Sequence, residues 1–276
     1  MRSLVHATVE FVAVEGRKLE VAYLAVPSAR GTVLLLHEAL GSVSYWRDFP
    51  ARLALATGHN VLHYSRPGHG NSDGPLEERT VAHYLRQTES VIPALLAHFG
   101  VTYPVLYGHS EGAGIAMLYA ATTRNARALI LESPYVVQEQ STLAHIRRMA
   151  AAYPGSRLQE RLAQYHRHAD TVFQSWAAWA VRFEVEEFFP RTLLEKIACP
   201  VLLLQGRNDE FGVAVHAAAL RVALPRLEHE LFENTGHLPH REVTDHLLSR
   251  VARFLNPSHP PAQPRDPLTL TTHLEE

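Results

Sequence analysis

The stretch that decides the fold is Leu106-Tyr-Gly-His-Ser-Glu-Gly-Ala-Gly114. Apolar residues 104–107 lead into its turn, and a second apolar run, residues 115–121, follows. This order predicts a buried strand, a tight turn and a helix. Ser110 lies at the turn inside the pattern G-x-S-x-G, whose glycines allow the close approach of strand and helix that such a turn needs. Ser110 is therefore our candidate nucleophile.

A second segment shows that the pattern alone is weak. Gly70-Asn-Ser-Asp-Gly74 also fits G-x-S-x-G. It lies in a run of loop-forming residues, 66–75, that closes with Gly-Pro, and no helix is predicted to begin at Ser72. The strand–turn–helix context therefore favours Ser110 over Ser72.

The bulk composition limits the class of protein. The chain has 276 residues, 46% of them hydrophobic, which suits one large α/β domain with a small insertion. A formal net charge of −2 gives no sign of a nucleic-acid or anionic-membrane partner. The single cysteine, Cys199, excludes an internal disulfide framework. The 18 histidines show no metal-ligand spacing, so we expect no metal and no cofactor.

The N-terminal residues contain no apolar signal-peptide core, and no apolar run reaches membrane-spanning length. We therefore expect a cytoplasmic protein that acts on a small molecule and has no membrane partner. Assembly into a homo-oligomer is left open.

The pattern of strands and helices indicates an α/β fold. Alternating residues 8–26 predict an antiparallel hairpin, and strand and helix patterns then alternate along the chain. The prediction is a mostly parallel, eight-stranded sheet with helices on both faces. Later strands are expected at 31–37, 61–64, 104–109, 128–132, 200–205 and 228–232, and helices at 45–57, 80–99 (interrupted at Pro93), 212–223 and 240–255.

We divide the chain into three parts. Residues 1–135 and 191–255 carry the strand pattern and form the predicted core domain. Residues 136–190 have helical periodicity and are rich in Ala, Arg, Gln, His and aromatic residues. Residues 256–276 contain five prolines and form a predicted tail.

A serine nucleophile needs a base, and that base needs a carboxylate to fix its tautomer. In sheets with this turn the chain order is serine, acid, histidine. Asp209 directly follows the strand 200–205 and is our first choice for the acid. Its neighbour Glu210 is easily confused with it, and Glu132, at the end of the strand after Ser110, is the runner-up.

The base is expected after the last strand. His237 follows a glycine in a loop, from which its ring can reach Ser110. We expect His240 to be a solvated residue in the first turn of the next helix.

The oxyanion of a tetrahedral intermediate needs two N–H donors. One is expected from Glu111, the residue after the nucleophile. The other is expected from Ala39 in the loop His37-Glu-Ala-Leu-Gly41, with Leu40 and Glu38 as alternatives.

Taken together, these motifs resemble the α/β-hydrolase superfamily over about residues 8–255. The resemblance rests on His37-Glu-Ala-Leu-Gly-Ser42, Gly108-His-Ser-Glu-Gly112, Gly206-Arg-Asn-Asp209 and Gly236-His237, in the expected order. It also implies that residues 136–190 form a helical cap over the site. The family commonly has glycine where this chain has Glu38. Because an inward carboxylate would repel an oxyanion, we expect Glu38 to point away and to pair with an arginine.

The aromatic and arginine side chains of the predicted cap have two interpretations. They either line an acyl pocket that tolerates a negative group, or they pack the cap onto the core and face solvent, and we favour the second. The residues are Tyr153, Tyr165, Phe173, Trp176, Trp179, Phe183, Phe188 and Phe189, and Arg147, Arg148, Arg157, Arg161, Arg167 and Arg182.

The sequence thus predicts a serine hydrolase of a small carboxylic ester, thioester or lactone. Hydrolysis of a C–C bond in a diketone-like substrate by the same triad is the alternative. A non-catalytic binding protein with this fold is a third hypothesis, although such proteins often lack a triad member and all three positions are filled here.

Overall fold

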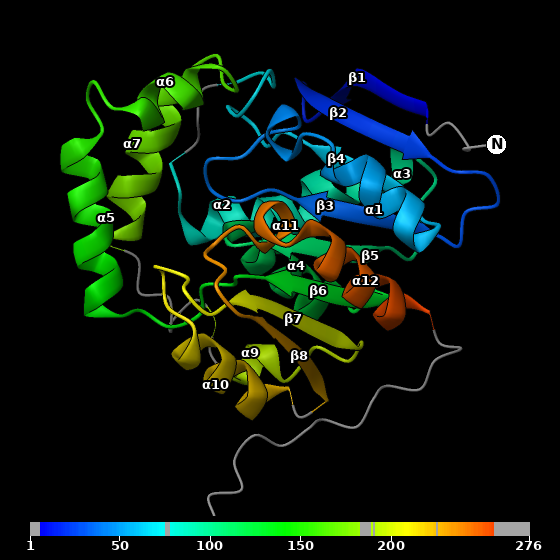
Figure 1. Cartoon of the computed structure of the whole chain (residues 1–276). Coiled ribbons are helices and arrows are strands. Elements are labelled where there is room, and N and C mark those ends of the chain that lie inside the picture. Colours follow the sequence, from blue (N-terminus) through cyan, green and yellow to red (C-terminus); the bar gives the residue numbers. More distant parts are fainter. Residues whose placement is uncertain (1–5, 75–77, 183–188, 190, 225, 257–276) are drawn as a thin grey trace, which may run out of the picture.

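One eight-stranded sheet runs through the molecule in the order β1-β2-β4-β3-β5-β6-β7-β8 (Figure 1). The computed structural model describes residues 6–74, 78–182, 189, 191–224 and 226–256. The pairs β1/β2 and β2/β4 are antiparallel, and all other neighbours are parallel, which confirms the predicted fold class. The strands are β1 (His6–Val14), β2 (Arg17–Ala25), β3 (Thr32–Leu36), β4 (Asn60–Tyr64), β5 (Val105–His109), β6 (Ala128–Glu132), β7 (Val201–Gly206) and β8 (Leu227–Phe232).

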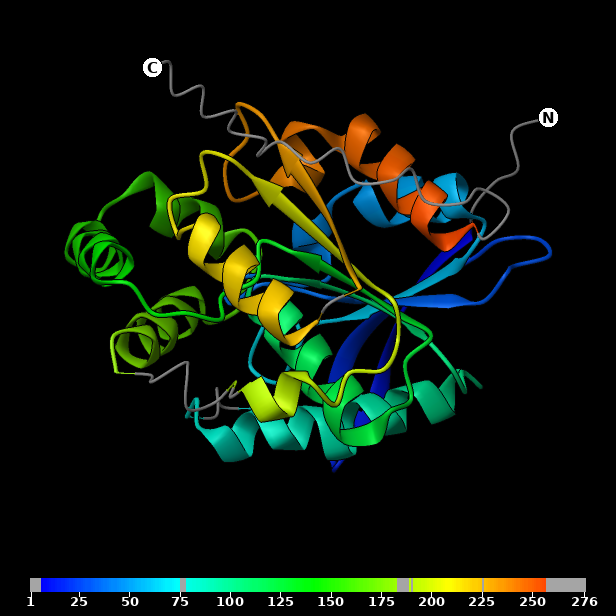
Figure 2. The same ribbon diagram turned by 90° about the horizontal axis from the view of Figure 1, so that it is seen from below.

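Helices cover both faces of this sheet (Figure 2). Side chains of α1 (Phe49–Thr57) and α12 (Thr244–Leu255) pack on one face. The opposite face is covered by α2 (Val81–Arg86), α3 (Ile92–His98), α4 (Glu111–Thr123), α9 (Arg191–Leu194) and α10 (Ala214–Ala223).

The central strands explain why the sheet is covered twice. Every residue of β3, β5 and β6 is buried, as expected of parallel strands with helices on both faces. Along β5, Leu106 packs into the core under α4, whereas Val105 and Tyr107 pack into the core under α1 and α12. Alternate side chains of one strand therefore belong to two separate cores.

Two predicted helices are interrupted. The helix expected over 80–99 consists of α2, a π-helical turn at Gln87–Val91, and α3, whose second residue is Pro93. The kink or break predicted at Pro93 is thus a π-helical turn just before that proline, and residues 81–98 stay helical. The helix expected over 240–255 is two helices, α11 (Pro239–Glu242) and α12, because Val243 between them has φ −134° and ψ 42°, outside the helical region.

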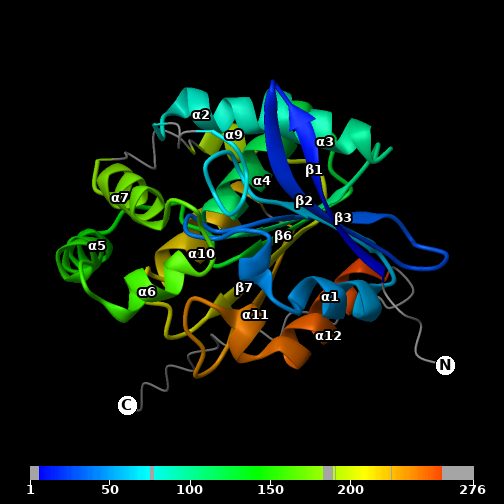
Figure 3. The ribbon, with the colours of Figure 1, turned by 90° about the horizontal axis from the view of Figure 1, so that it is seen from above.

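Among the described residues between β6 and β7, three helices lie at one end of the sheet, apart from α9 (Figure 3). These are α5 (Gln140–Ala152), α6 (Arg157–Ala163) and α7 (Ala169–Ala180). Their apolar side chains form a third cluster that includes Ala39 and Leu40 of the loop after β3. The predicted tail, residues 257–276, lies outside the described residues. Among the helices that the structure describes, none is both long and apolar enough to cross a membrane.

Candidate active site

Ser110 occupies a strained turn between β5 and α4. Its φ of 52° and ψ of −114° are rare for a residue with a side chain, and its N–H donates to the Glu132 carbonyl oxygen at 2.9 Å. A Cβ on Gly108 would lie 2.3 Å from the Gly112 carbonyl oxygen, and one on Gly112 would lie 2.0 Å from that of Leu36. Both glycines of the pattern are therefore required by close backbone contacts, and the half-buried serine lines a pocket.

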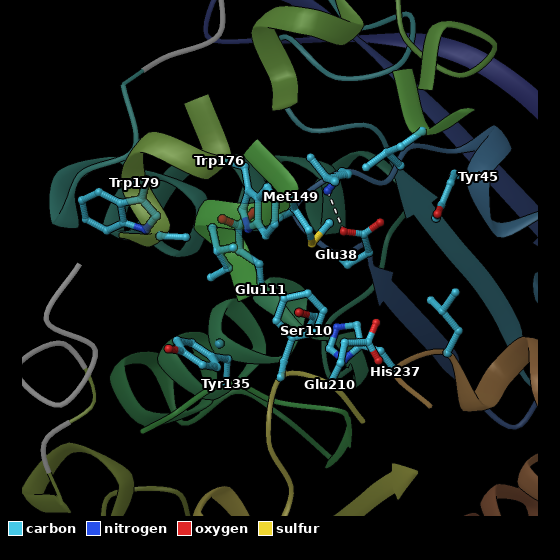
Figure 4. Close-up of a pocket in the computed structure, with 18 of the residues that line it drawn as sticks. Glu38, Tyr45, Ser110, Glu111, Tyr135, Met149, Trp176, Trp179, Glu210 and His237 are labelled. Carbon is cyan, nitrogen blue, oxygen red and sulfur yellow. Dashed lines mark hydrogen bonds between the residues drawn. The ribbon is translucent and has the colours of Figure 1, made fainter. Parts of the chain in front are cut away.

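His237 and Asp209 are brought together by the loops after β7 and β8. The two loops touch at Gly206, where a Cβ would lie 2.1 Å from the Gly236 carbonyl oxygen. The Nδ1 of His237 lies 2.9 Å from Oδ1 and 2.8 Å from Oδ2 of Asp209. His237 also lines the pocket that Ser110 lines, and Figure 4 shows both residues facing it. The structure thus brings the three predicted residues to one site.

Asp209 and His237 each favour the charged form of the other. Burial alone would raise the pKa of Asp209, but the nearby His237 holds that pKa below its ordinary value. Burial alone would lower the pKa of His237, but the Asp209 carboxylate raises it above its ordinary value. The N–H of Phe211 donates to Asp209 Oδ1 at 2.9 Å, which fixes the orientation of the carboxylate.

Glu132, the runner-up for the acid, is committed to another histidine. Its Oε1 accepts from the backbone N–H of His240 and lies 2.8 Å from the Nδ1 of that ring, while its Oε2 accepts from the Tyr107 hydroxyl. The expectation that His240 is solvated is wrong: the residue is 2% exposed and packs beside Phe49. Sequence periodicity placed His240 correctly in a first turn but could not show that this turn faces the core.

His109, Glu132 and His240 also place three potential metal-ligand atoms within 4.8 Å of one another. Hydrogen bonds already engage the members of this group, because the Nε2 of His109 lies 2.9 Å from the His237 carbonyl oxygen. Burial outweighs the neighbouring Glu132 and lowers the pKa of His109 to about 3, so that ring is neutral. The cluster contacts the loop of His237 through the His109 ring.

Ser72, in the second G-x-S-x-G segment, has a structural role. Its hydroxyl donates to the Ser65 carbonyl oxygen at 2.6 Å and accepts from the Glu20 N–H at 2.9 Å. The residue is buried, and it is not among those that line the pocket.

The loop after β3 carries the predicted oxyanion donor, Ala39. Ala39 lines the same pocket as Glu111, the first residue of α4. Leu40, one of the alternatives, donates its N–H to Glu38 Oε2 at 2.6 Å. The expectation for Glu38 is wrong: its carboxylate faces the pocket (Figure 4), and Arg66 instead donates to the backbone oxygen of Glu38.

Two arginines that were not among the predicted site residues bind the side chain of Glu111, the residue that follows Ser110. Arg66 and Arg79 both bind the carboxylate of Glu111, and the Tyr84 hydroxyl donates to it at 2.6 Å. Burial would raise the pKa of Glu111, but the two guanidinium groups hold it far below its ordinary value. Arg66 begins the run of loop-forming residues 66–75 noted in the sequence, whereas only the fold brings Arg79 to this position.

Aromatic and aliphatic side chains form most of the pocket wall. Of the aromatic residues predicted in the insertion, Trp176, Trp179 and Phe189 line the pocket, and so does Arg161. Tyr153 and Phe173 stack on each other with ring centroids 3.6 Å apart. Some of these side chains therefore line the pocket and others pack against one another, and the acyl-pocket interpretation stays a prediction. Phe183 and Phe188 lie outside the described residues. The remaining lining residues are Glu38, Ala39, Leu40, Tyr45, Tyr84, Ser110, Glu111, Gly114, Tyr135, Ile146, Met149, Leu158, Ala180, Glu210, Phe211, His237 and Leu238.

Comparison with known proteins places the chain in a family. A model of the alpha/beta hydrolase family matches residues 33–251. The chain belongs to this family.

Individual relatives include enzymes of two kinds. The 2-hydroxy-6-oxononadienedioate/2-hydroxy-6-oxononatrienedioate hydrolase 2 of Pseudomonas putida is 28% identical over 269 residues, which cover 86% of this chain and 92% of the relative. Among solved structures, the 2-hydroxy-6-oxo-6-phenylhexa-2,4-dienoate hydrolase of a Rhodococcus strain matches with a TM-score of 0.74 at 17% identity, covering 90% of this chain and 98% of the other. The naproxen esterase of Bacillus subtilis matches with a TM-score of 0.70 at 18% identity, covering 91% and 92%. These likenesses support a hydrolase with the alpha/beta fold.

Proposed function

We propose that this protein is a serine hydrolase that cleaves a small carboxylic ester, thioester or lactone through an acyl-enzyme. Ser110 is the nucleophile, His237 the general base and Asp209 the residue that orients it. The observation that carries the proposal is the hydrogen-bonded pair of His237 and Asp209 in the pocket that Ser110 also lines.

The proposed reaction has two halves. The Ser110 hydroxyl attacks the carbonyl carbon while His237 Nε2 takes its proton, and the carbonyl oxygen becomes an oxyanion held by the N–H groups of Ala39 and Glu111. When the intermediate collapses, the leaving alcohol or thiol receives the proton from His237. Water then repeats the sequence on the acyl-enzyme, releases the acid and restores Ser110.

The helices α5, α6 and α7 act in this proposal as a cap that selects the acyl group. Their side chains that face the pocket include Met149, Arg161, Trp176 and Trp179. Because no group of the cap is needed to move a proton, the cap contributes to substrate positioning and to the exclusion of water.

A fluorophosphonate probe tests the proposal without knowledge of the substrate. The probe should label the wild-type protein and Ser72→Ala, and should fail to label Ser110→Ala. Ser72→Ala is a matched control, because it carries the same substitution in the same sequence pattern. Labelling of Ser110→Ala together with loss in Ser72→Ala would assign the nucleophile to the second segment, and an unlabelled wild-type protein would favour a non-catalytic binding protein.

A C–C bond hydrolase is the second candidate, favoured by the similarity to the Pseudomonas putida dienedioate hydrolase over most of both chains. Both reactions use the same three residues, so the probe does not separate them. A panel of p-nitrophenyl esters of increasing acyl length, lactones and a diketone-like C–C substrate does. A kcat/KM at least tenfold higher for the C–C substrate than for the best ester would favour this candidate.

A further inference from the structure

Glu38 is an unusual residue at the edge of the proposed oxyanion site. The motif resemblance predicts glycine at this position, yet the chain places a carboxylate here that lines the pocket. Its Oε2 accepts the backbone N–H of Leu40, two residues further along, at 2.6 Å, and a dashed line marks this bond in Figure 4. This short charge-assisted bond gives Glu38 a defined contact within its own loop.

Side chains from outside the loop fix its carbonyl groups. Arg66 donates to the carbonyl oxygens of His37 and Glu38, at 2.5 and 2.9 Å. Arg79 donates to the Ala39 oxygen at 2.9 Å, and His166 Nε2 lies 2.8 Å from the Leu40 oxygen. These side chains therefore fix the direction in which the carbonyl oxygens of the loop point.

The N–H groups of the loop differ in whether they already have a hydrogen-bond acceptor. Gly41 donates its N–H to the Glu38 oxygen at 3.1 Å, and the Leu40 N–H is bound by the Glu38 carboxylate. Within the part of the chain that the structure describes, the N–H of Ala39 has no such partner. Of the Ala39, Leu40 and Gly41 donors, that of Ala39 is therefore left for a ligand in the pocket; among the described residues the N–H of Glu38, the other alternative, is not hydrogen-bonded either.

We propose that Glu38 is a positioning residue, which binds the Leu40 N–H and thereby holds the turn so that Ala39 presents its N–H to the oxyanion. The inference rests on the proposed serine hydrolase function and deepens it. This role explains why an acidic residue can occupy a position where glycine is expected. The side-chain hydrogen bond to Leu40 fixes the conformation of the turn and leaves the Ala39 N–H for the oxyanion.

The negative charge of Glu38 is moderated by its surroundings. Burial raises the pKa of Glu38 above its ordinary value, while the Leu40 N–H that binds one of its oxygens, His237 and Arg66 act in the opposite direction. Glu111, the other acidic residue of the oxyanion site, is bound by Arg66 and Arg79. Arg66 therefore acts against the negative charge of both carboxylates, and Arg79 acts against that of Glu111.

Two variants of nearly equal size separate the hydrogen bond from the charge and the volume. Glu38→Gln removes the charge but keeps an oxygen that can accept from Leu40, whereas Glu38→Met has no comparable acceptor. Removal of a whole oxyanion donor costs about 10²- to 10³-fold in rate, so a donor that is only misplaced should cost roughly 10- to 100-fold. We expect Glu38→Gln to stay within about threefold of wild type and Glu38→Met to lose roughly 10- to 100-fold.

The measurement is the rate constant of fluorophosphonate labelling at Ser110, together with kcat and KM for the best ester of the panel. The loss in Glu38→Met should fall on kcat and on the labelling rate, with KM within about threefold, because an oxyanion contact forms only in the transition state. Glu210→Gln and Glu210→Met are the matched controls. Glu210 is another carboxylate of the pocket and acts electrostatically on His237, and its two variants should react at the same rate.

Equal rates for Glu38→Gln and Glu38→Met would overturn the inference, as would a loss confined to KM. If Glu38→Met fails to fold by circular dichroism, Glu38→Ala takes its place, and a slow Glu38→Gln is already sufficient to refute the role of the hydrogen bond. Failure of the proposed function is distinguishable, because wild-type Ser110 would then not be labelled at all.

Discussion

Replacing Asp209 by asparagine should reduce kcat roughly 10⁴-fold, and the geometry explains the size of the loss. Oδ1 of Asp209 accepts the Phe211 N–H at 2.9 Å, and Oδ2 lies 2.8 Å from His237 Nδ1. The amide oxygen of an asparagine would remain at the Phe211 N–H, which turns its NH₂ group toward His237. Nδ1 must then accept a hydrogen bond, and the proton moves to Nε2, where it blocks uptake of the proton from Ser110. The expected loss corresponds to roughly 5 kcal/mol of transition-state stabilisation.

The assay is kcat for p-nitrophenyl ester hydrolysis, with the fluorophosphonate labelling rate as a second measure. Glu132→Gln is the control, since it makes the same acid-to-amide change in a carboxylate that binds His240 instead of His237. We expect it to lower kcat by less than about tenfold. An Asp209→Asn enzyme that retains a tenth of wild-type kcat, or a larger loss in Glu132→Gln, would refute the assignment of the acid.

Three further predictions follow from the electrostatics and the pocket. Because Asp209 raises the pKa of His237 above its ordinary value and the base must be neutral, kcat/KM should fall as the pH drops through that raised pKa, and Asp209→Asn should move the fall to lower pH in a pH–rate profile. Burial would raise the pKa of Glu132, but His240 lowers it to about 2. The resulting stability is present above about pH 4.3 and is lost toward pH 2, so the difference in free energy of unfolding between wild type and Glu132→Gln, measured by urea denaturation, should shrink over that range. Met149 lines the pocket from α5, so Met149→Trp should lower kcat/KM for octanoyl esters at least tenfold more than for acetyl esters; equal losses would place the acyl site elsewhere.

Much of the fold could be predicted because each strand carries its own signal. Continuous apolar runs such as residues 32–36 mark strands that are buried on both faces, and the structure buries every residue of β3. The triad candidates could also be identified, because Ser110, Asp209 and His237 each follow a strand that ends at the same edge of the sheet. Local patterns sufficed wherever function depends on position along the chain.

The directions of individual side chains could not be predicted from local sequence patterns. His240 lies in a first turn that packs on Phe49. Glu38 faces the pocket and accepts the Leu40 N–H, while Arg66 binds Glu111 and backbone oxygens. Arg79 reaches Glu111 from 32 residues away in the sequence. Such contacts depend on how separate elements pack, and no periodicity reports them.

The two G-x-S-x-G segments show how the proposed nucleophile differs from a structural serine. Around Ser72 the pattern forms a loop. The Ser72 hydroxyl donates to the Ser65 carbonyl oxygen and accepts from the Glu20 N–H, and the residue is buried. Around Ser110 the glycines serve the backbone, bringing α4 within contact of β3 and leaving the hydroxyl on the wall of a pocket. A serine hydroxyl that donates its proton in a hydrogen bond to a backbone carbonyl oxygen cannot at the same time donate it to a catalytic histidine. The state of the hydroxyl proton, rather than the sequence pattern, therefore separates Ser110 from Ser72.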